Sequence, residues 1–159
     1  MSKVLWKGIG FGLTSGVITT LGVVVGLHSG TQSRTAVLVG IVVVALADAF
    51  SDAMGIHVSE EAEHEHTARE QWESALFTFV SKLFVALSFT IPITLLDLNT
   101  AILASVAWGL ILIATFSITL AKSQGQNACK VTAEHALITL LVVLLAHYLG
   151  DAIHWALGA

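Results

Sequence analysis

Two aspartates stand within a long apolar stretch of this sequence. Asp48 and Asp52 are four residues apart and therefore share one face of a helix. At 1.5 Å per residue, Asp48 lies roughly 14 Å along the helix from His57, near the middle of a bilayer if the stretch crosses one. A carboxylate there costs about 2.5–3.5 kcal/mol, and two on one face repel unless a cation or proton lies between them. Three interpretations follow: protonated, hydrogen-bonded carboxyls, an ion pair with Lys82, or ligands for a permeating cation.

A second row of polar residues occurs near the end of the sequence. His147, Asp151 and His154 are spaced four and three residues apart, so they stack along one helical face. Imidazole and carboxylate in that arrangement share a metal ion or pass a proton. For His147 and Asp151 the plainer interpretation is a hydrogen bond between helices. For His154 it is a hydrated position at the membrane interface. His28 and Asp97 are more typical of solvated helix ends.

The densest group of potential metal ligands lies in the polar segment of residues 57–73. This segment interleaves carboxylates with imidazoles, a combination that suits Fe²⁺, Mn²⁺ or Zn²⁺. Charge runs are also often only solvated faces. The candidate ligands are Glu60, Glu61, Glu63, His64 and His66.

The composition indicates that a membrane positions these residues. The chain is 55% hydrophobic and 11% charged, against about 45–50% and about 25% in soluble domains. Five stretches reach the length of about 20 apolar residues that a spanning helix needs. We therefore expect an all-α integral membrane protein with one transmembrane domain, whose spans cover residues 8–27, 35–56, 74–96, 100–120 and 133–157.

The basic residues predict an orientation, because cytoplasmic loops carry an excess of Lys and Arg. A cytoplasmic N-terminus leaves only Arg34 on the opposite side. The C-terminus is then on the non-cytoplasmic side of a cell membrane or vacuole-type membrane. No basic patch is available for phosphates, so we expect no nucleic-acid partner. The cytoplasmic side holds Lys3, Lys7, Arg69, Lys122 and Lys130.

The first span carries two rows of glycine at intervals of four residues. Small residues at this interval let helix backbones approach closely in lipid. The rows lie on different faces, since six residues of helix turn through about 240°. One row could pack within the chain and the other against a second subunit, or both within the chain. The rows are Gly8, Gly12 and Gly16, and then Gly22, Gly26 and Gly30.

Residues 12–27, and residues 47–55 running into the acidic stretch 59–63, resemble the vacuolar iron transporter family. Residues 148–150 are similar to the last helix of that family. The resemblance implies a five-helix subunit, a homodimer with its pathway at the two-fold axis, and divalent-metal/proton antiport out of the cytoplasm.

The chain departs from this family at the residues expected to hold metal. The family's first-helix aspartate falls at Ser15, and its second-helix methionine ligand falls at Asp52. Asp48 replaces a small residue, and the family's acidic residue one turn before that position falls at Val44. The family's separate cytoplasmic metal-binding domain is missing, which leaves only the Glu/His segment. Replacement of a thioether by carboxylates favours Mn²⁺ or another hard cation.

We therefore expect a transporter and not an enzyme, with lipid and metal ions as partners. The Glu/His segment would collect the ion, and Asp52 and Asp48 would bind it within the membrane. His147 and Asp151 would complete the path or carry protons, and Lys82 would lie beside the path. The metal is cargo, and no permanently bound cofactor is expected. One alternative is a membrane-embedded metal-dependent enzyme, for which no nucleophile or phosphate-binding motif is found. The other is a non-transporting sensor or assembly subunit.

Overall fold

The computed structural model describes residues 3–63 and 65–158, with side chains from Trp6 onward. Every regular element in these residues is a helix, and the predicted ligand His64 and the side chain of Lys3 lie outside them. The helices are α1 (Lys3–Thr31), α2 (Arg34–Glu63), α3 (Ala68–Ser88), α4 (Thr90–Leu95), α5 (Leu98–Ser123) and α6 (Ala128–Leu157).

The predicted set of five membrane spans is confirmed. Within the described residues, five helical stretches are long and apolar enough to cross a membrane, and α3 with α4 forms the third. The second span is longer than predicted. Helix α2 continues without a break through residues 57–63, so the first half of the polar segment extends the span.

The third span is broken near its end, where the sequence predicted one continuous helix. Helix α3 ends at Ser88, and α4 begins at Thr90 after one turn residue. Pro92 explains the break, because its ring clashes with the carbonyl four residues earlier and it has no N–H to donate. Trp108 Nε1 of α5 donates to Ser88 Oγ across 3.0 Å and fixes this corner.

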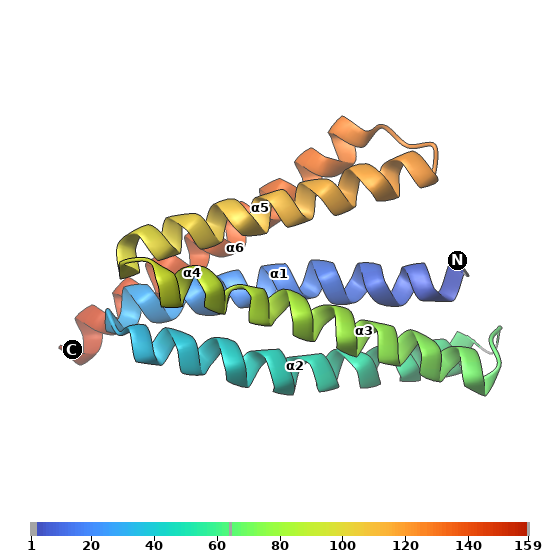
Figure 1. The fold of residues 1–159 in the computed structure, drawn as a ribbon, viewed down its shortest axis with the longest axis horizontal. Helices are drawn as coiled ribbons and strands as arrows, with labels where there is room; N and C mark the ends of the chain where they lie inside the picture. Colours follow the sequence, from blue (N-terminus) through green and yellow to red (C-terminus); the bar gives the residue numbers. More distant parts are fainter. Residues whose placement is uncertain (1–2, 64, 159) are drawn as a thin grey trace.

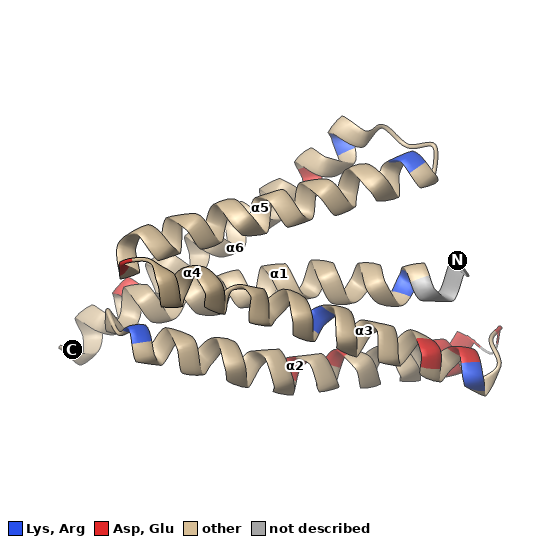
Figure 2. Ribbon diagram, in the orientation of Figure 1, with Lys and Arg blue, Asp and Glu red and all other residues tan. Residues whose placement is uncertain are grey.

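The helices are arranged around α1, which contacts α2, α3, α5 and α6 (Figure 1). The two termini lie at opposite ends of the bundle, as an odd number of spans requires. Helices α5 and α6 diverge from the other helices toward the end that holds the N-terminus. Most of the charged residues gather at that same end (Figure 2).

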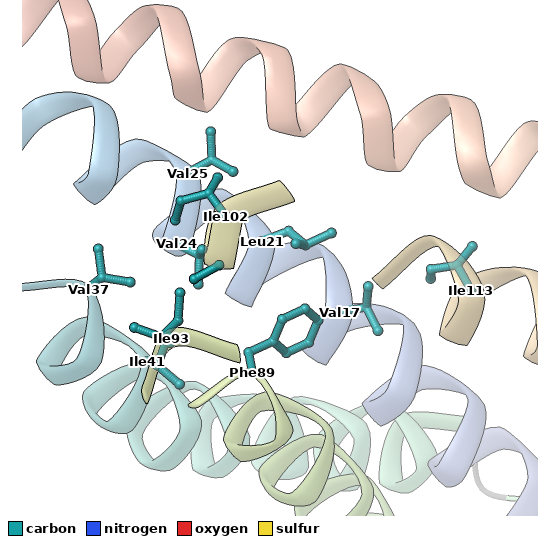
Figure 3. Close-up of a cluster of buried hydrophobic side chains, with 11 residues drawn as sticks. Val17, Leu21, Val24, Val25, Val37, Ile41, Phe89, Ile93, Ile102 and Ile113 are labelled. Atoms are coloured by element: carbon teal, nitrogen blue, oxygen red, sulfur yellow. The ribbon is translucent and has the colours of Figure 1, made fainter. Parts of the chain in front are cut away.

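The apolar core lies toward the other end of the bundle (Figure 3). Val17 and Leu21 of α1, Ile41 of α2 and Phe89 between α3 and α4 are fully buried there. Among the five spans α6 contributes least to the interior, since only Thr139 and Gly150 of it are buried. Its exposed leucines form an apolar surface that suits contact with lipid.

Both glycine rows of α1 pack within the chain. The first row faces α3: a Cβ on Gly8 would lie 2.5 Å from Ser74 O, and one on Gly12 would overlap Thr78 O. The second row faces α6, where a Cβ on Gly150 would lie 2.5 Å from Gly26 O. Both rows therefore face helices of the same subunit, as one of the two interpretations expects.

Candidate functional site

Lys82 lies between the two membrane-embedded aspartates. Its side chain is 1% exposed, and its Nζ is 2.5 Å from Asp48 Oδ2. The same ammonium contacts Asp52 Oδ2 and donates to Ser15 Oγ across 2.9 Å. Of the three interpretations of the aspartates, the structure contains the ion pair with Lys82. The side chain is buried in the bundle and does not extend to the water phase.

The first glycine row sets this arrangement. A Cβ on Gly16 would lie 3.3 Å from both Cγ and the carbonyl oxygen of Lys82, so α1 and α3 are in close contact at this level. The approach brings Ser15 of α1 to the ammonium. This is the position at which the resemblance places an aspartate, and here it supplies a neutral hydroxyl.

Asp48 and Asp52, which we call the inner acidic pair, are not sealed within the subunit. Their side chains are 29% and 18% exposed on the outer side of α2. Two ionised carboxylates and one ammonium leave a net charge of −1 at this point. Three small residues, Ala47, Ser51 and Gly55, lie exposed beside the pair at intervals of four. The centre is therefore closed on its α1 and α3 side and partly open on the other.

A second carboxylate pair lies at the end of α2. Glu60 and Glu63, the terminal acidic pair, offer ligand atoms within 4.8 Å of each other and of His66. The Glu60 side chain is fully buried, and Lys7 Nζ lies 2.9 Å from its Oε1 and 3.1 Å from Glu63 Oε1. His66 Nε2 lies 3.3 Å from Glu60 Oε2. Neither Glu60 oxygen has a partner in hydrogen-bonding geometry, which leaves lone pairs for a cation.

The turn after α2 brings His66 back over Glu60. Thr67 caps the start of α3 in a capping box, in which its backbone N–H donates to Glu70 Oε2 across 2.9 Å. Gln71 Nε2 donates to the carbonyl of His66 across 3.1 Å. These contacts explain why a histidine outside any helix joins a site on α2.

The structure separates the other candidates of the polar segment from this cluster. Glu61 is exposed and is not part of the cluster. His57 packs its ring on Trp72, with ring centroids 4.1 Å apart. The sequence indicates Lys7 only as a cytoplasmic charge, since nothing in a single sequence shows which carboxylates a distant lysine meets.

The polar row of α6 is anchored on two consecutive residues of α1. His147 Nδ1 lies 2.5 Å from Ser29 Oγ, and His154 Nδ1 lies 3.3 Å from the carbonyl oxygen of Gly30. The Nε2 of His147 faces Asp151 Oδ2 across 3.5 Å. One nitrogen of each imidazole is thus held by α1, and the second nitrogen of His147 faces a carboxylate.

The two residues expected at helix ends behave differently from each other. Asp97 caps α5, and the Thr100 N–H that donates to its carboxylate holds the pKa of Asp97 below its usual value. His28 instead pairs with Asn99 Oδ1 across 3.1 Å. It also lines, with His147, a cavity of about 490 Å³ between α1, α5 and α6.

Sequence reasoning missed His135, which lies within the fifth span. Its Nδ1 is 2.8 Å from Ser117 Oγ of α5, and the ring lines a cavity of about 350 Å³ together with Trp6 and Lys7. Its position in the sequence, two residues inside a predicted span, could have marked it as a candidate.

The chain is an all-helical membrane protein with ionisable groups inside its spans. In membrane proteins such groups typically mark ion or substrate pathways. A family model described as the VIT family matches residues 7–71, from the start of α1 to the first turn of α3. The match covers less than half of the chain, and this part of the chain is similar to the VIT family. Both acidic pairs lie in the matched part, whereas Lys82 and the row of α6 lie outside it. No curated protein matches the chain.

Proposed function

We propose that this chain exports a divalent transition-metal ion of the iron or manganese type from the cytoplasm in exchange for protons. The observation that carries this proposal is the placement of both acidic pairs on α2. At 100° per residue all four carboxylates fall within about 120° of one another around the helix. They form a row from the charged end of the bundle toward its middle.

The terminal acidic pair and His66 would collect the ion at the cytoplasmic mouth. Carboxylate and imidazole ligands together suit Mn²⁺, Fe²⁺ or Zn²⁺. The three ligand atoms within 4.8 Å of one another are close enough to share one ion after small side-chain shifts. Burial of Glu60 supports this role, because a buried carboxylate gains most from a cation beside it.

The inner acidic pair would then bind the ion within the membrane. Asp52 lies about 12 Å along α2 from Glu60, at 1.5 Å per residue. A carboxylate that accepts either a metal ion or a proton exchanges the two by competition, which is the basis of antiport. His147 and Asp151 near the opposite end would complete the path or carry the protons.

A homodimer would cover the open side of the inner acidic pair. Carboxylates that are 29% and 18% exposed on a single subunit are costly against lipid. The exposed row of Ala47, Ser51 and Gly55 lets a second helix approach closely. We therefore place the two-fold axis beside α2, with the N-terminus in the cytoplasm and the C-terminus on the other side.

A non-transporting sensor or assembly subunit is the second candidate. The contacts of Lys82 with Asp48 and Asp52 favour it, because an ion pair can stabilise the bundle without any cargo. Metal flux separates the two candidates. Vesicles that contain the purified chain should take up Mn²⁺, Fe²⁺ or Zn²⁺ faster when a pH gradient is imposed than without one. Uptake equal to that of empty vesicles for all three metals, by a chain that still binds them, would establish the second candidate.

A further inference from the structure

Each acidic pair of α2 holds a lysine from a neighbouring helix. Lys82 of α3 lies between Asp48 and Asp52, and Lys7 of α1 lies between Glu60 and Glu63. The same local arrangement thus occurs twice along one helix, with the two lysines supplied by different helices.

We propose that Lys7 and Lys82 are tethered competitors for the transported cation, each holding with its ammonium the position that the ion takes. This inference rests on the proposed transport function and assigns the control of cation affinity to the two lysines. Binding of the ion and contact with the lysine then exclude each other at both pairs.

The contacts at Lys82 show why both cannot be present. Its ammonium is surrounded by three oxygens, from Asp48, Asp52 and Ser15. Two of its three N–H groups donate to Asp52 and Ser15, and Asp48 Oδ2 lies 2.5 Å away outside hydrogen-bonding geometry. A divalent ion at the same carboxylate oxygens would lie within a few ångströms of the ammonium, and the two like charges would repel strongly in a buried site.

Charge gives the lysines a function in the cycle. With its lysine in place, either acidic pair has a net charge of −1; with the lysine displaced, the charge is −2 and matches a divalent ion. The tethered charge therefore stabilises the carboxylates before cargo arrives. It also competes with the bound cargo for the carboxylates, which lowers the affinity for the ion and favours its release.

The two lysines differ in how freely they can move. The Lys7 side chain is 41% exposed and can turn into water, whereas that of Lys82 is 1% exposed and has to leave a buried site. Exchange should consequently be easy at the terminal acidic pair and slower at the inner one. The inner pair then sets the affinity at which the cargo is held.

The test is Mn²⁺ binding by the full chain in lipid nanodiscs, with free Mn²⁺ measured by electron paramagnetic resonance. Lys82→Met should tighten binding by at least about tenfold, because it removes a competing like charge. Lys82→Arg keeps the charge and should bind less tightly than Lys82→Met. Lys130→Met, at an exposed lysine, is the matched control and should equal the unchanged chain. Binding by Lys82→Met that is equal or weaker overturns the proposal.

A second measurement uses the unchanged chain, in case Lys82→Met does not fold. Acetylation of Lys7 by a water-soluble amine reagent, followed by mass spectrometry, should become faster when Mn²⁺ is added, while that of Lys130 should not. An unchanged rate at Lys7 in a chain that binds Mn²⁺ overturns this inference alone. Absence of Mn²⁺ binding in both the unchanged chain and Lys82→Met overturns the proposed function as well.

Discussion

Ser29 Oγ of α1 and His147 Nδ1 of α6 lie 2.5 Å apart, close to the glycine contact between the two helices. Ser29 is 3% exposed, so the imidazole is held from the protein side while its Nε2 faces Asp151. The contact depends on a close crossing, because a Cβ on Gly150 would lie 2.5 Å from Gly26 O and 2.8 Å from Ser29 Cβ. Backbone packing and the orientation of a candidate pathway residue are therefore coupled.

The crossing predicts the effect of adding one methyl group. Gly150→Ala should lower the free energy of unfolding by about 1–3 kcal/mol, since the new Cβ overlaps backbone atoms that cannot move independently. Thermal unfolding in detergent measures this. Gly30→Ala is the matched control, because its Cβ would meet α6 only at 3.5 Å or more. Equal stability of the two variants would contradict the close crossing.

The Ser29 contact predicts a functional effect without a new clash. Ser29→Ala should reduce metal flux by about tenfold, since loss of the group that orients an ion- or proton-carrying imidazole typically costs 10–100-fold. Ser105→Ala removes another buried hydroxyl, which donates only to the carbonyl of Ala101 in its own helix, and should leave flux unchanged. Flux in vesicles that falls equally in both variants would mean that buried hydroxyls matter only for folding.

Glu63 belongs to the cluster at the end of α2 and Glu61 does not, so the two glutamates should differ in their effect on metal affinity. Glu63→Gln should raise the metal concentration for half-maximal flux by about tenfold, because loss of one charged contact is worth about 1.5–3 kcal/mol. The maximal rate should change little. Glu61→Gln should have no such effect, since Glu61 is exposed and outside the cluster. The opposite ranking of the two variants would mean that the polar segment binds metal in another arrangement.

The dimer predicted beside α2 can be tested by cross-linking. In a Cys129→Ser background, Ser51→Cys should form an intersubunit disulfide under mild oxidation in membranes, because a two-fold axis there brings the two copies of residue 51 together. Leu145→Cys, on the exposed face of α6, should not. Gel electrophoresis without reductant reads both. Cross-linking through residue 145 alone would place the interface on α6.

The parts of the fold set by local pattern were predictable from the sequence. Five apolar stretches define five spans because lipid imposes their length, and the glycine intervals indicate two contact faces on α1. The break at Phe89 could also have been predicted from Pro92, because proline has no N–H to donate and interrupts a helix locally.

The parts that depend on contacts between helices were not predictable from one sequence. Glu60 and Glu63 share a face by helical spacing, but the arrival of Lys7 and His66 depends on how α1 and the turn before α3 pack. Pairing of Lys82 with both aspartates was one of three interpretations, since a lysine also reaches water by extending along its helix. The structure shows that its ammonium meets both aspartates of α2, and the approach of α1 to α3 at Gly16 adds Ser15 to them.

Metal flux through the inner acidic pair tests the central claim most directly. Vesicles with an imposed pH gradient should show Mn²⁺ flux for the unchanged chain and for Glu73→Gln, which alters only a surface pair with Arg69. The double variant Asp48→Asn, Asp52→Asn should reduce flux to the level of empty vesicles. Undiminished flux through the folded double variant would contradict the assignment of these two carboxylates as the membrane-embedded cation site.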